Sequence, residues 1–112
     1  MEETVFSRII RGDLPADKVF ENDKIIAIKD LHPIAPVHLL IISKKVIPNL
    51  SSVTGEDAAL ISEMVMTAKK LAAEFGISEG YRLLTNNGIS AGQTIFHLHM
   101  HLIGGRPLGA MG

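Results

Sequence analysis

The sequence predicts an α+β fold in which one long helix packs on a five-stranded antiparallel sheet, with a short helix at the N-terminus. Residues 54–75 form one long stretch with apolar side chains at helical spacing, which predicts an amphipathic helix. Short runs rich in β-branched and apolar residues lie on both sides of this stretch and predict strands. Because the chain has only 112 residues and contains no repeat or low-complexity linker, we expect a single domain over residues 1–112.

The N-terminal part of the chain predicts a short helix and a hairpin. Thr4 can cap a helix that continues to about Ile10, where a glycine and a proline soon follow. Strand-like runs at residues 17–21 and 24–30 are separated by an Asn-Asp pair, as in a tight hairpin turn. We therefore expect these two strands to pair antiparallel.

The middle of the chain predicts a central strand and the long helix. Residues 31–36 hold two prolines and form a loop, after which Val37–Ser43 is almost continuously apolar, as in a central strand. Thr54, with Asp57 three residues later, resembles a capping box at the start of the helix, and Gly76 stands where a helix commonly stops. The apolar helical positions expected to pack on the sheet are Leu60, Ile61, Met64, Val65, Ala68, Leu71, Ala72 and Phe75.

Two further strands complete the predicted sheet. We expect one strand at residues 81–85 and a last strand at residues 94–103. Between them, residues 86–92 form a polar, glycine-bearing loop. The last strand carries three of the five histidines of the chain, so the predicted chemistry lies at its C-terminal end.

Composition excludes several functional classes. Hydrophobic residues make up 46% of the chain and the formal net charge is −1, so neither disorder nor broad attraction to nucleic acid is expected. The chain contains no cysteine, which excludes disulfides, thiolate catalysis and cysteine zinc sites. No apolar run is long enough for a secretory signal or a membrane span, so we expect a cytoplasmic protein without a membrane partner.

His97, His99 and His101 alternate with apolar residues near the C-terminus. Because successive side chains of a strand point to opposite faces, this spacing predicts three imidazoles in a row on one face. Histidine has an unperturbed pKa of about 6.5 and can act as a nucleophile, a base or an acid near neutral pH. From the residues alone, three interpretations stay open: a nucleophile with acid/base partners, a set of metal ligands, or structural histidines.

The loop before the histidines favours phosphate chemistry. Residues 86–94 combine glycines with amides and hydroxyls, which permit close backbone approach and supply donors for phosphate oxygens. A metal site needs no such cradle. The chain has no GxxxxGK[ST] pattern, so a Walker-type nucleotide site is excluded.

These residues resemble a known family. His97 to Ile103 match the histidine triad pattern, in which three histidines are each followed by a hydrophobic residue and a further hydrophobic residue closes the motif. The resemblance extends through residues 6–15, 30–40 and 80–105. It is greatest to the bacterial histidine triad nucleotide-binding proteins, whereas the galactose-1-phosphate uridylyltransferase branch usually has glutamine at the position of His101.

The resemblance implies a hydrolase of purine nucleoside phosphoramidates that needs no metal and no cofactor. His99 would attack the α-phosphorus and form a covalent nucleotidyl-histidine, from which water releases a nucleoside monophosphate such as AMP. His101 would hydrogen-bond a phosphate oxygen or the leaving group, and His97 would help to orient the nucleophile. His38 would be a supporting histidine next to these three. These four histidines are the predicted catalytic set.

The resemblance also implies a nucleotide-binding set. Asp30 would accept hydrogen bonds from the ribose hydroxyls, and Asn86 would contact the nucleotide. The implied α-phosphate ligands are Gly92, Gln93 and Thr94. The implied apolar slot for the base is formed by Val5, Phe6, Ile9, Ile28 and Leu31; from the residues alone these would be core positions.

The resemblance further implies a homodimer with joined sheets and packed long helices, and the broad apolar stripe around Met64 and Val65 is compatible with it. Three alternative functions stay open. They are a dinucleoside polyphosphate hydrolase of the same family, a non-catalytic nucleotide sensor or scaffold, and a metal-dependent enzyme that uses the three histidines.

Overall fold

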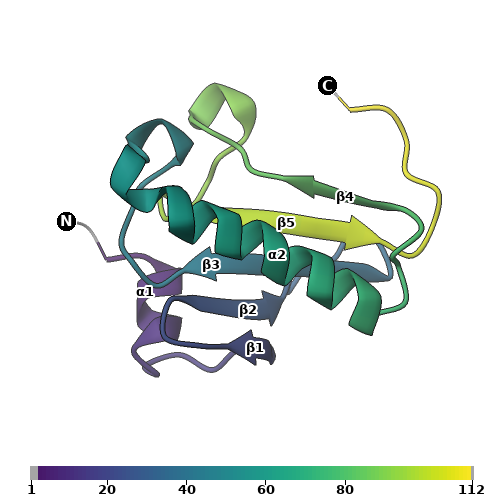
Figure 1. The fold of residues 1–112 in the computed structure, drawn as a ribbon, viewed down its shortest axis with the longest axis horizontal. Helices are drawn as coiled ribbons and strands as arrows, with labels where there is room; N and C mark the ends of the chain where they lie inside the picture. Colours follow the sequence, from purple (N-terminus) through teal and green to yellow (C-terminus); the bar gives the residue numbers. More distant parts are fainter. Residues whose placement is uncertain (1–2, 112) are drawn as a thin grey trace.

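The computed structural model describes residues 3–111 and has the predicted α+β architecture (Figure 1). The five strands form one antiparallel sheet in the order β1-β2-β3-β5-β4. The strands are β1 (Lys18–Glu21), β2 (Ile25–Lys29), β3 (Val37–Ser43), β4 (Tyr81–Leu84) and β5 (His99–Gly104). The helices are α1 (Val5–Ile10) and α2 (Ala58–Glu74), with short 3-10 turns η1 (Leu50–Ser52), η2 (Gly55–Asp57) and η3 (Ile89–Ala91).

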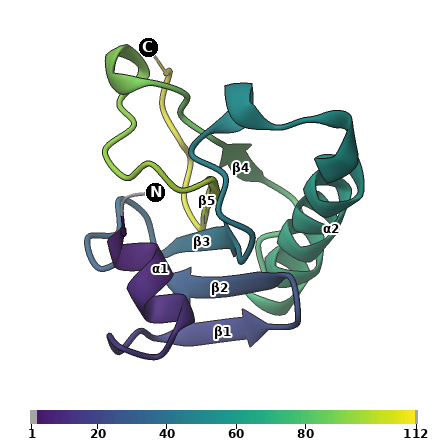
Figure 2. The same cartoon turned by 90° about the vertical axis from the view of Figure 1, so that its left-hand side faces the viewer.

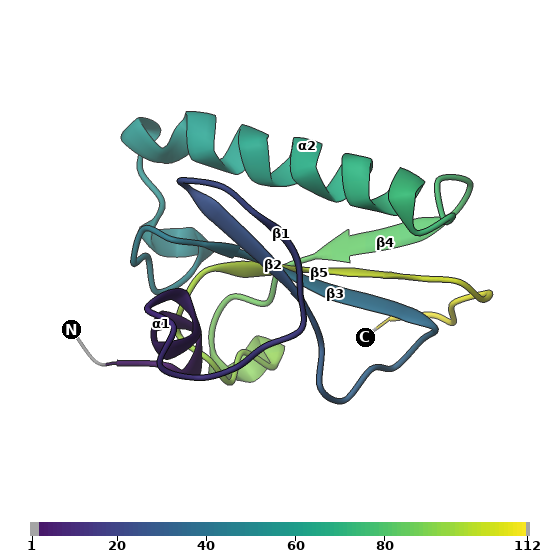
Figure 3. The same ribbon diagram turned by 90° about the horizontal axis from the view of Figure 1, so that it is seen from below.

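The sheet has two covered faces, with α2 on one and α1 on the other (Figure 3). The alternation of side chains along the central strands divides the core accordingly, so that Leu39 and Ile41 face α2 while Leu40 and Ile42 face α1. The core under α2 comprises Ile25, Ala27, Leu39, Ile41, Ile47, Met64, Ala68, Leu71, Ala72, Ile77, Leu98, Met100 and Leu102. The core against α1 comprises Phe6, Ile9, Ile26, Ile28, Leu40 and Ile42.

The short helix α1 covers only part of its face of the sheet. The segment before β5 lies next to the part that α1 leaves uncovered (Figure 2). Thr4 caps this helix as predicted, since its hydroxyl accepts a hydrogen bond from the N–H of Ser7 at 3.1 Å. At the start of α2, the Asp57 carboxylate accepts a hydrogen bond from the N–H of Thr54 at 3.0 Å. Lys45 also donates to this buried carboxylate, which holds the pKa of Asp57 below its ordinary value.

Two details of the helix and strand predictions need correction. The last strand does not begin at residue 94, because β3 ends at Ser43 and offers no ladder partner before His99. Leu98 is held instead by isolated hydrogen bonds, from its own N–H to the carbonyl of Ile47 at 2.7 Å and from the N–H of Ser43 to its carbonyl at 3.3 Å. On α2, Val65 is 42% exposed and does not pack on the sheet, although Met64 beside it is fully buried.

The register of β3 on β5 brings two histidines together. Leu40 lies opposite His101 and His38 lies opposite Ile103, so His38 and His101 are diagonal neighbours on the α1 face. Within the described residues 3–111, no helix is long and apolar enough to cross a membrane.

Candidate active site

Two of the three clustered histidines open into a hollow on the α1 face of the sheet. This hollow, which we call the histidine hollow, has a volume of about 130 Å³. Its lining residues are Phe6, Asp30, Leu40, Asn86, Gly92, Gln93, Thr94, Ile95, His99 and His101. The site therefore combines β3, β5 and α1 with the residue that follows β2 and with the loop that follows β4.

The hydrogen bond of His99 fixes which of its ring nitrogens can react. Nδ1 lies 2.6 Å from the main-chain oxygen of His97. A carbonyl oxygen can only accept, so Nδ1 carries the hydrogen and donates it. The neutral ring then has its lone pair on Nε2, which is the nucleophilic form. The Phe6 ring packs against the imidazole edge to face at a centroid distance of 4.8 Å and helps to hold its orientation.

His38 and His101 form a directed hydrogen-bond chain. The N–H of Ile34 donates to Nδ1 of His38 at 3.2 Å, so this nitrogen is an acceptor and the hydrogen of the ring is on Nε2. Nε2 of His38 lies 2.9 Å from Nδ1 of His101 and donates to it. A neutral His101 must then carry its own hydrogen on Nε2. The chain thus presents a hydrogen-bond donor beside His99, whose ring centroid is 5.2 Å from that of His101.

Asp30 lies between this chain and the mouth of the site. Its Oδ1 accepts a hydrogen bond from the N–H of His32 at 2.7 Å, and its Oδ2 lies 3.5 Å from Nε2 of His38. The carboxylate lines the histidine hollow and also the apolar groove next to it. A carboxylate at this junction can accept hydrogen bonds from vicinal hydroxyl groups.

Burial keeps His97, His99 and His101 neutral. It lowers the pKa of His99 and of His97 below the ordinary 6.5 of histidine. Burial, followed by repulsion from His99 and His38, lowers the pKa of His101 to about 4. At pH 7 the hollow therefore contains neutral imidazoles, in agreement with the hydrogen-bond directions.

His97 lies on the same side of the sheet but not in the hollow. Its side chain is fully buried, and its Nε2 donates to the main-chain oxygen of Ser43 at 2.5 Å. Its Nδ1 is buried without a partner among the described residues. The hydrogen bond between His97 and His99 uses the main-chain oxygen of His97, so the predicted row of three imidazoles is in fact a pair, His99 and His101, with the His97 ring buried outside the hollow.

The loop before β5 offers fewer free donors than its sequence indicates. The N–H groups of Gly92 and Gln93 donate to the carbonyls of Ile89 and Gly88 at the start of the η3 turn. The Gln93 amide is also occupied, since it accepts from the N–H of Gly88 and donates to the carbonyls of Pro48 and Ile95. Within residues 3–111, the N–H and hydroxyl of Thr94 donate to no protein group, so Thr94 is a free donor of the loop toward the hollow.

An apolar groove of about 290 Å³ continues from the histidine hollow, and the two share Phe6, Asp30, Leu40, Thr94 and Ile95. All five predicted base-slot residues line it, namely Val5, Phe6, Ile9, Ile28 and Leu31. Leu40 and Ile95 are lining residues that the sequence reasoning missed. Leu40 could have been found, because it lies two residues after His38 on the same face of a strand.

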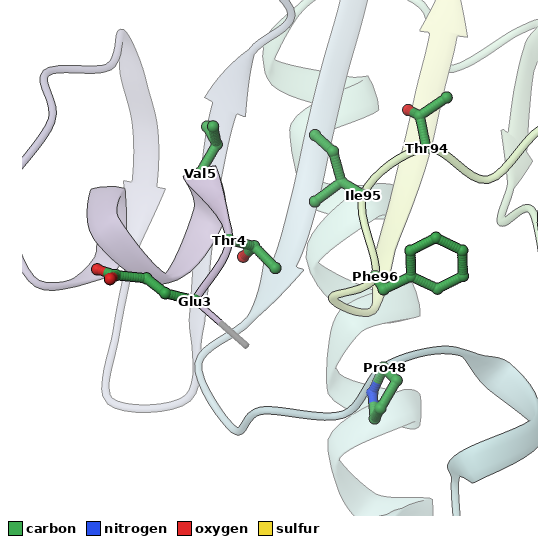
Figure 4. A pocket seen from close by; sticks show the side chains of 7 residues that line it. All are labelled: Glu3, Thr4, Val5, Pro48, Thr94, Ile95 and Phe96. Atoms are coloured by element: carbon green, nitrogen blue, oxygen red, sulfur yellow. The ribbon is translucent and has the colours of Figure 1, made fainter. Parts of the chain in front are cut away.

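A larger hollow of about 520 Å³ lies beside the start of α1 (Figure 4). It is lined by Glu3, Thr4, Val5, Pro48, Thr94, Ile95 and Phe96, none of which is a histidine. The Glu3 carboxylate points away from the other labelled side chains, toward Arg11. Thr94 and Ile95 connect it to the histidine hollow, but the side chains able to attack phosphorus lie in the smaller space.

Among residues 3–111, the residues that could bind a metal ion are Asp30, His38 and His101, whose donor atoms lie within 4.8 Å of one another. A metal on Nε2 of His38 would require the hydrogen of that ring on Nδ1, where the N–H of Ile34 already points at 3.2 Å. Two donors would then face each other. The hydrogen bonding of His38 thus favours the hydrogen-bond chain with His101 over metal coordination.

Comparison with known proteins agrees with this geometry. The profile of the HIT domain family matches residues 11–108, and the chain belongs to that family. This confirms the family predicted from the histidine pattern. The chain is 56% identical over 108 residues to a HIT-like protein of Chlamydia pneumoniae, covering 96% of this chain and 98% of that protein. It is 46% identical over 111 residues to the purine nucleoside phosphoramidase of Escherichia coli K12, covering 98% and 93% of the two chains.

A solved structure shows the same fold. The HIT family hydrolase of Legionella pneumophila superposes with a TM-score of 0.94 at 44% identity, and the match covers 96% of each chain.

Proposed function

We propose that this protein hydrolyses purine nucleoside phosphoramidates through a nucleotidyl intermediate on His99. The hydrogen bond from Nδ1 of His99 to the carbonyl of His97 carries the proposal, because it leaves the Nε2 lone pair free for attack. The similarity to the Escherichia coli phosphoramidase supports the choice of substrate class. The apolar groove next to the hollow supports a purine base, with Asp30 at the ribose and Thr94 at the phosphate.

The proposed reaction has two steps. In the first, Nε2 of His99 forms a bond to the α-phosphorus while the bond from phosphorus to the amine nitrogen breaks, and the leaving amine takes a proton from solvent. The ring becomes an imidazolium whose Nδ1–H still donates to the His97 carbonyl, which stabilises its charge. In the second step, the oxygen of a water molecule forms a bond to phosphorus while the bond from phosphorus to Nε2 of His99 breaks. The water gives one proton to solvent, and the nucleoside monophosphate and neutral His99 are released.

His101 supports both steps as a donor. Its Nε2–H can bind a phosphoryl oxygen on which charge increases as the phosphorus is attacked. Because burial lowers the pKa of His101 to about 4, the ring stays neutral at pH 7 and donates a hydrogen bond without transferring its proton.

The experiment compares wild type, His99→Ala and His32→Ala on adenosine 5′-phosphoramidate. His99→Ala should lower kcat by a factor of about 10³ or more and leave AMP affinity within about tenfold. His32→Ala, an exposed histidine at the groove, should keep kcat within about twofold. Acid-quenched wild-type enzyme should carry an acid-labile AMP adduct on His99. An adduct on His97 or His101 would contradict the assigned roles.

Two controls separate the alternatives. Activity should survive exhaustive chelation if no metal takes part. Phosphoramidates should be cleaved with higher kcat/KM than diadenosine polyphosphates, and the reverse order would favour a dinucleoside polyphosphate hydrolase. Wild type that binds AMP but turns over no substrate of either class would favour a nucleotide sensor.

We also propose a cytoplasmic homodimer. Among the described residues, Val65 and Met66 on α2 are 42% and 57% exposed, and Tyr81 on the edge strand β4 is 39% exposed. Apolar side chains left on a helix and a free sheet edge support an interface there. Subcellular fractionation tests the location.

A further inference from the structure

The C-terminal segment contacts the active-site loop through one side chain. After β5, Arg106 reaches back across the fold, and its Nη2 donates to the main-chain oxygen of Ile34 at 2.8 Å. The same guanidinium donates through Nη1 to the carbonyl of Pro107 at 2.8 Å. Gly105 makes this approach possible, since it has φ +97° and a Cβ there would lie 3.0 Å from Cβ of Pro36.

Ile34 also helps to set the direction of the histidine chain, together with Asp30, whose carboxylate lies 3.5 Å from Nε2 of His38. Its side chain is 61% exposed and contributes little packing, so residue 34 is held mainly by its backbone. Its N–H donates to Nδ1 of His38 at 3.2 Å, while its carbonyl accepts from Arg106. The two hydrogen bonds therefore hold opposite sides of one residue in a loop that has no helix or strand hydrogen bonds of its own.

We propose that Arg106 is a positioning residue that fixes the tautomers of His38 and His101 by anchoring Ile34 against His38. This inference rests on the proposed function for its effect on catalysis, but not for its effect on the tautomers. With Ile34 in place, only a donor faces Nδ1 of His38, so each hydrogen in the chain points one way and His101 presents Nε2–H to the hollow.

Removal of the anchor should mix the tautomers. Water can replace the Ile34 N–H at Nδ1 of His38, and water both donates and accepts. His38 can then carry its hydrogen on Nδ1, in which case its Nε2 accepts from Nδ1–H of His101. His101 would present a lone pair, rather than a donor, to the phosphoryl oxygens.

The test compares Arg106→Met with Arg82→Met. Arg82 is a matched control, because its Nη2 also donates to a main-chain carbonyl of the C-terminal segment, that of Gly109 at 2.8 Å, but it has no link to His38. Ring nitrogen chemical shifts from ¹⁵N NMR report the tautomers without any substrate. Wild type and Arg82→Met should show His38 and His101 with hydrogen on Nε2. Arg106→Met should show a second tautomer of both rings.

The kinetic arm follows adenosine phosphoramidate hydrolysis. Arg106→Met should lower kcat about fivefold to tenfold, which is the effect of losing one oriented hydrogen bond, with AMP affinity within about twofold. Arg82→Met should stay within about twofold of wild type. Arg106→Lys keeps the charge and one donor group but not the forked guanidinium, so its tautomers and rate should lie between those of Arg106→Met and wild type.

The outcomes separate this inference from the proposed function. Unchanged tautomers in Arg106→Met would overturn the positioning role. Shifted tautomers with unchanged kcat would overturn its importance for catalysis. If wild type hydrolyses no phosphoramidate, the proposed function fails, and the NMR comparison still decides whether Arg106 orients the histidines.

Discussion

At the scale of single residues, the main-chain carbonyls around the site decide what the imidazoles can do. The carbonyl of His97 places the hydrogen of His99 on Nδ1, and the carbonyl of Ser43 occupies Nε2 of His97. His97 and His99 have equivalent positions in the sequence pattern, but their hydrogen-bond acceptors leave different ring nitrogens free. Sequence spacing predicted the two histidines that line the hollow, but it could not show which nitrogen is free, because the acceptors come from β3 and from irregular backbone.

His101 should make the protein sensitive to mild acid. Its pKa is about 4 in the folded protein against about 6.5 when unfolded, so the unfolded chain binds more protons between these values. The contribution of His101 to the free energy of unfolding should therefore be constant above pH 6.5 and should decrease as pH falls from 6.5 to 4. The loss should be about 1 to 3 kcal/mol, allowing for partial solvent screening.

Urea unfolding at pH 7 and pH 4.5 measures this difference. His101→Gln should reduce the decrease in unfolding free energy between the two pH values. Part of the decrease should persist, because burial also lowers the pKa values of His97 and His99. His32→Gln, at an exposed position, should leave the loss as in wild type. A wild-type stability that does not change between the two pH values would contradict the assignment.

Thr94 should contribute to transition-state binding through its hydroxyl and N–H. Because these groups have no described protein partner, they are free to meet a phosphoryl oxygen. Thr94→Val keeps the shape but removes the hydroxyl, and should raise the barrier for kcat/KM by about 1 to 3 kcal/mol. Thr94→Ser keeps the hydroxyl and should stay within about threefold of wild type. Equal kinetics for Thr94→Val and wild type would show that the Thr94 hydroxyl does not contact the phosphoryl group.

At the scale of elements, the sequence was most informative where one periodicity ran uninterrupted. Helix α2 follows from its apolar spacing and ends just before Gly76 as expected, whereas the predicted Thr54 and Asp57 pair caps the 3-10 turn η2 that leads into it. The N-terminal limit of β5 could not be predicted, because His97 and Leu98 continue the alternation without a ladder partner. Periodicity reports which face a side chain takes, whereas a strand also needs a neighbour.

The loop before β5 depends on one amide. The Gln93 side chain is 5% exposed and links Gly88, Pro48 and Ile95. Gln93→Glu keeps the acceptor for Gly88 but places an oxygen against two carbonyls, so it should destabilise the fold by about 1 to 3 kcal/mol. Asn87→Asp is the matched control, since only an acceptor is used there, toward the N–H of Ser51.

Thermal unfolding checks this pair of variants. We expect a clearly lowered Tm for Gln93→Glu and a change within about 0.5 kcal/mol for Asn87→Asp. The opposite order would show that the loop is held by other contacts. The prediction of Gln93 as a phosphate ligand came from its place in the sequence motif, and its burial could not be inferred without the positions of Pro48 and Gly88.

At the scale of the whole molecule, the two faces of the sheet separate stability from chemistry. The α2 face holds the larger apolar core, while the α1 face is incomplete and carries the histidine hollow and the groove. The outer side of α2 and the free edge of β4 carry the exposed apolar residues Val65, Met66 and Tyr81. If two copies pack there, both active sites stay open, since α1 lies on the opposite face (Figure 3).

Met66→Glu should therefore shift the protein from dimer to monomer. A two-fold interface would place the introduced carboxylate opposite or near its own copy, so each dimer would bury two like charges without partners. Light scattering on a sizing column at tens of micromolar protein should show the mass of two chains for wild type and of one chain for the variant. Met111→Glu, at a methionine that is 60% exposed near the C-terminus, should keep the wild-type mass. A monomeric wild type, or a Met66→Glu variant that retains the dimer mass, would place the interface elsewhere or exclude it.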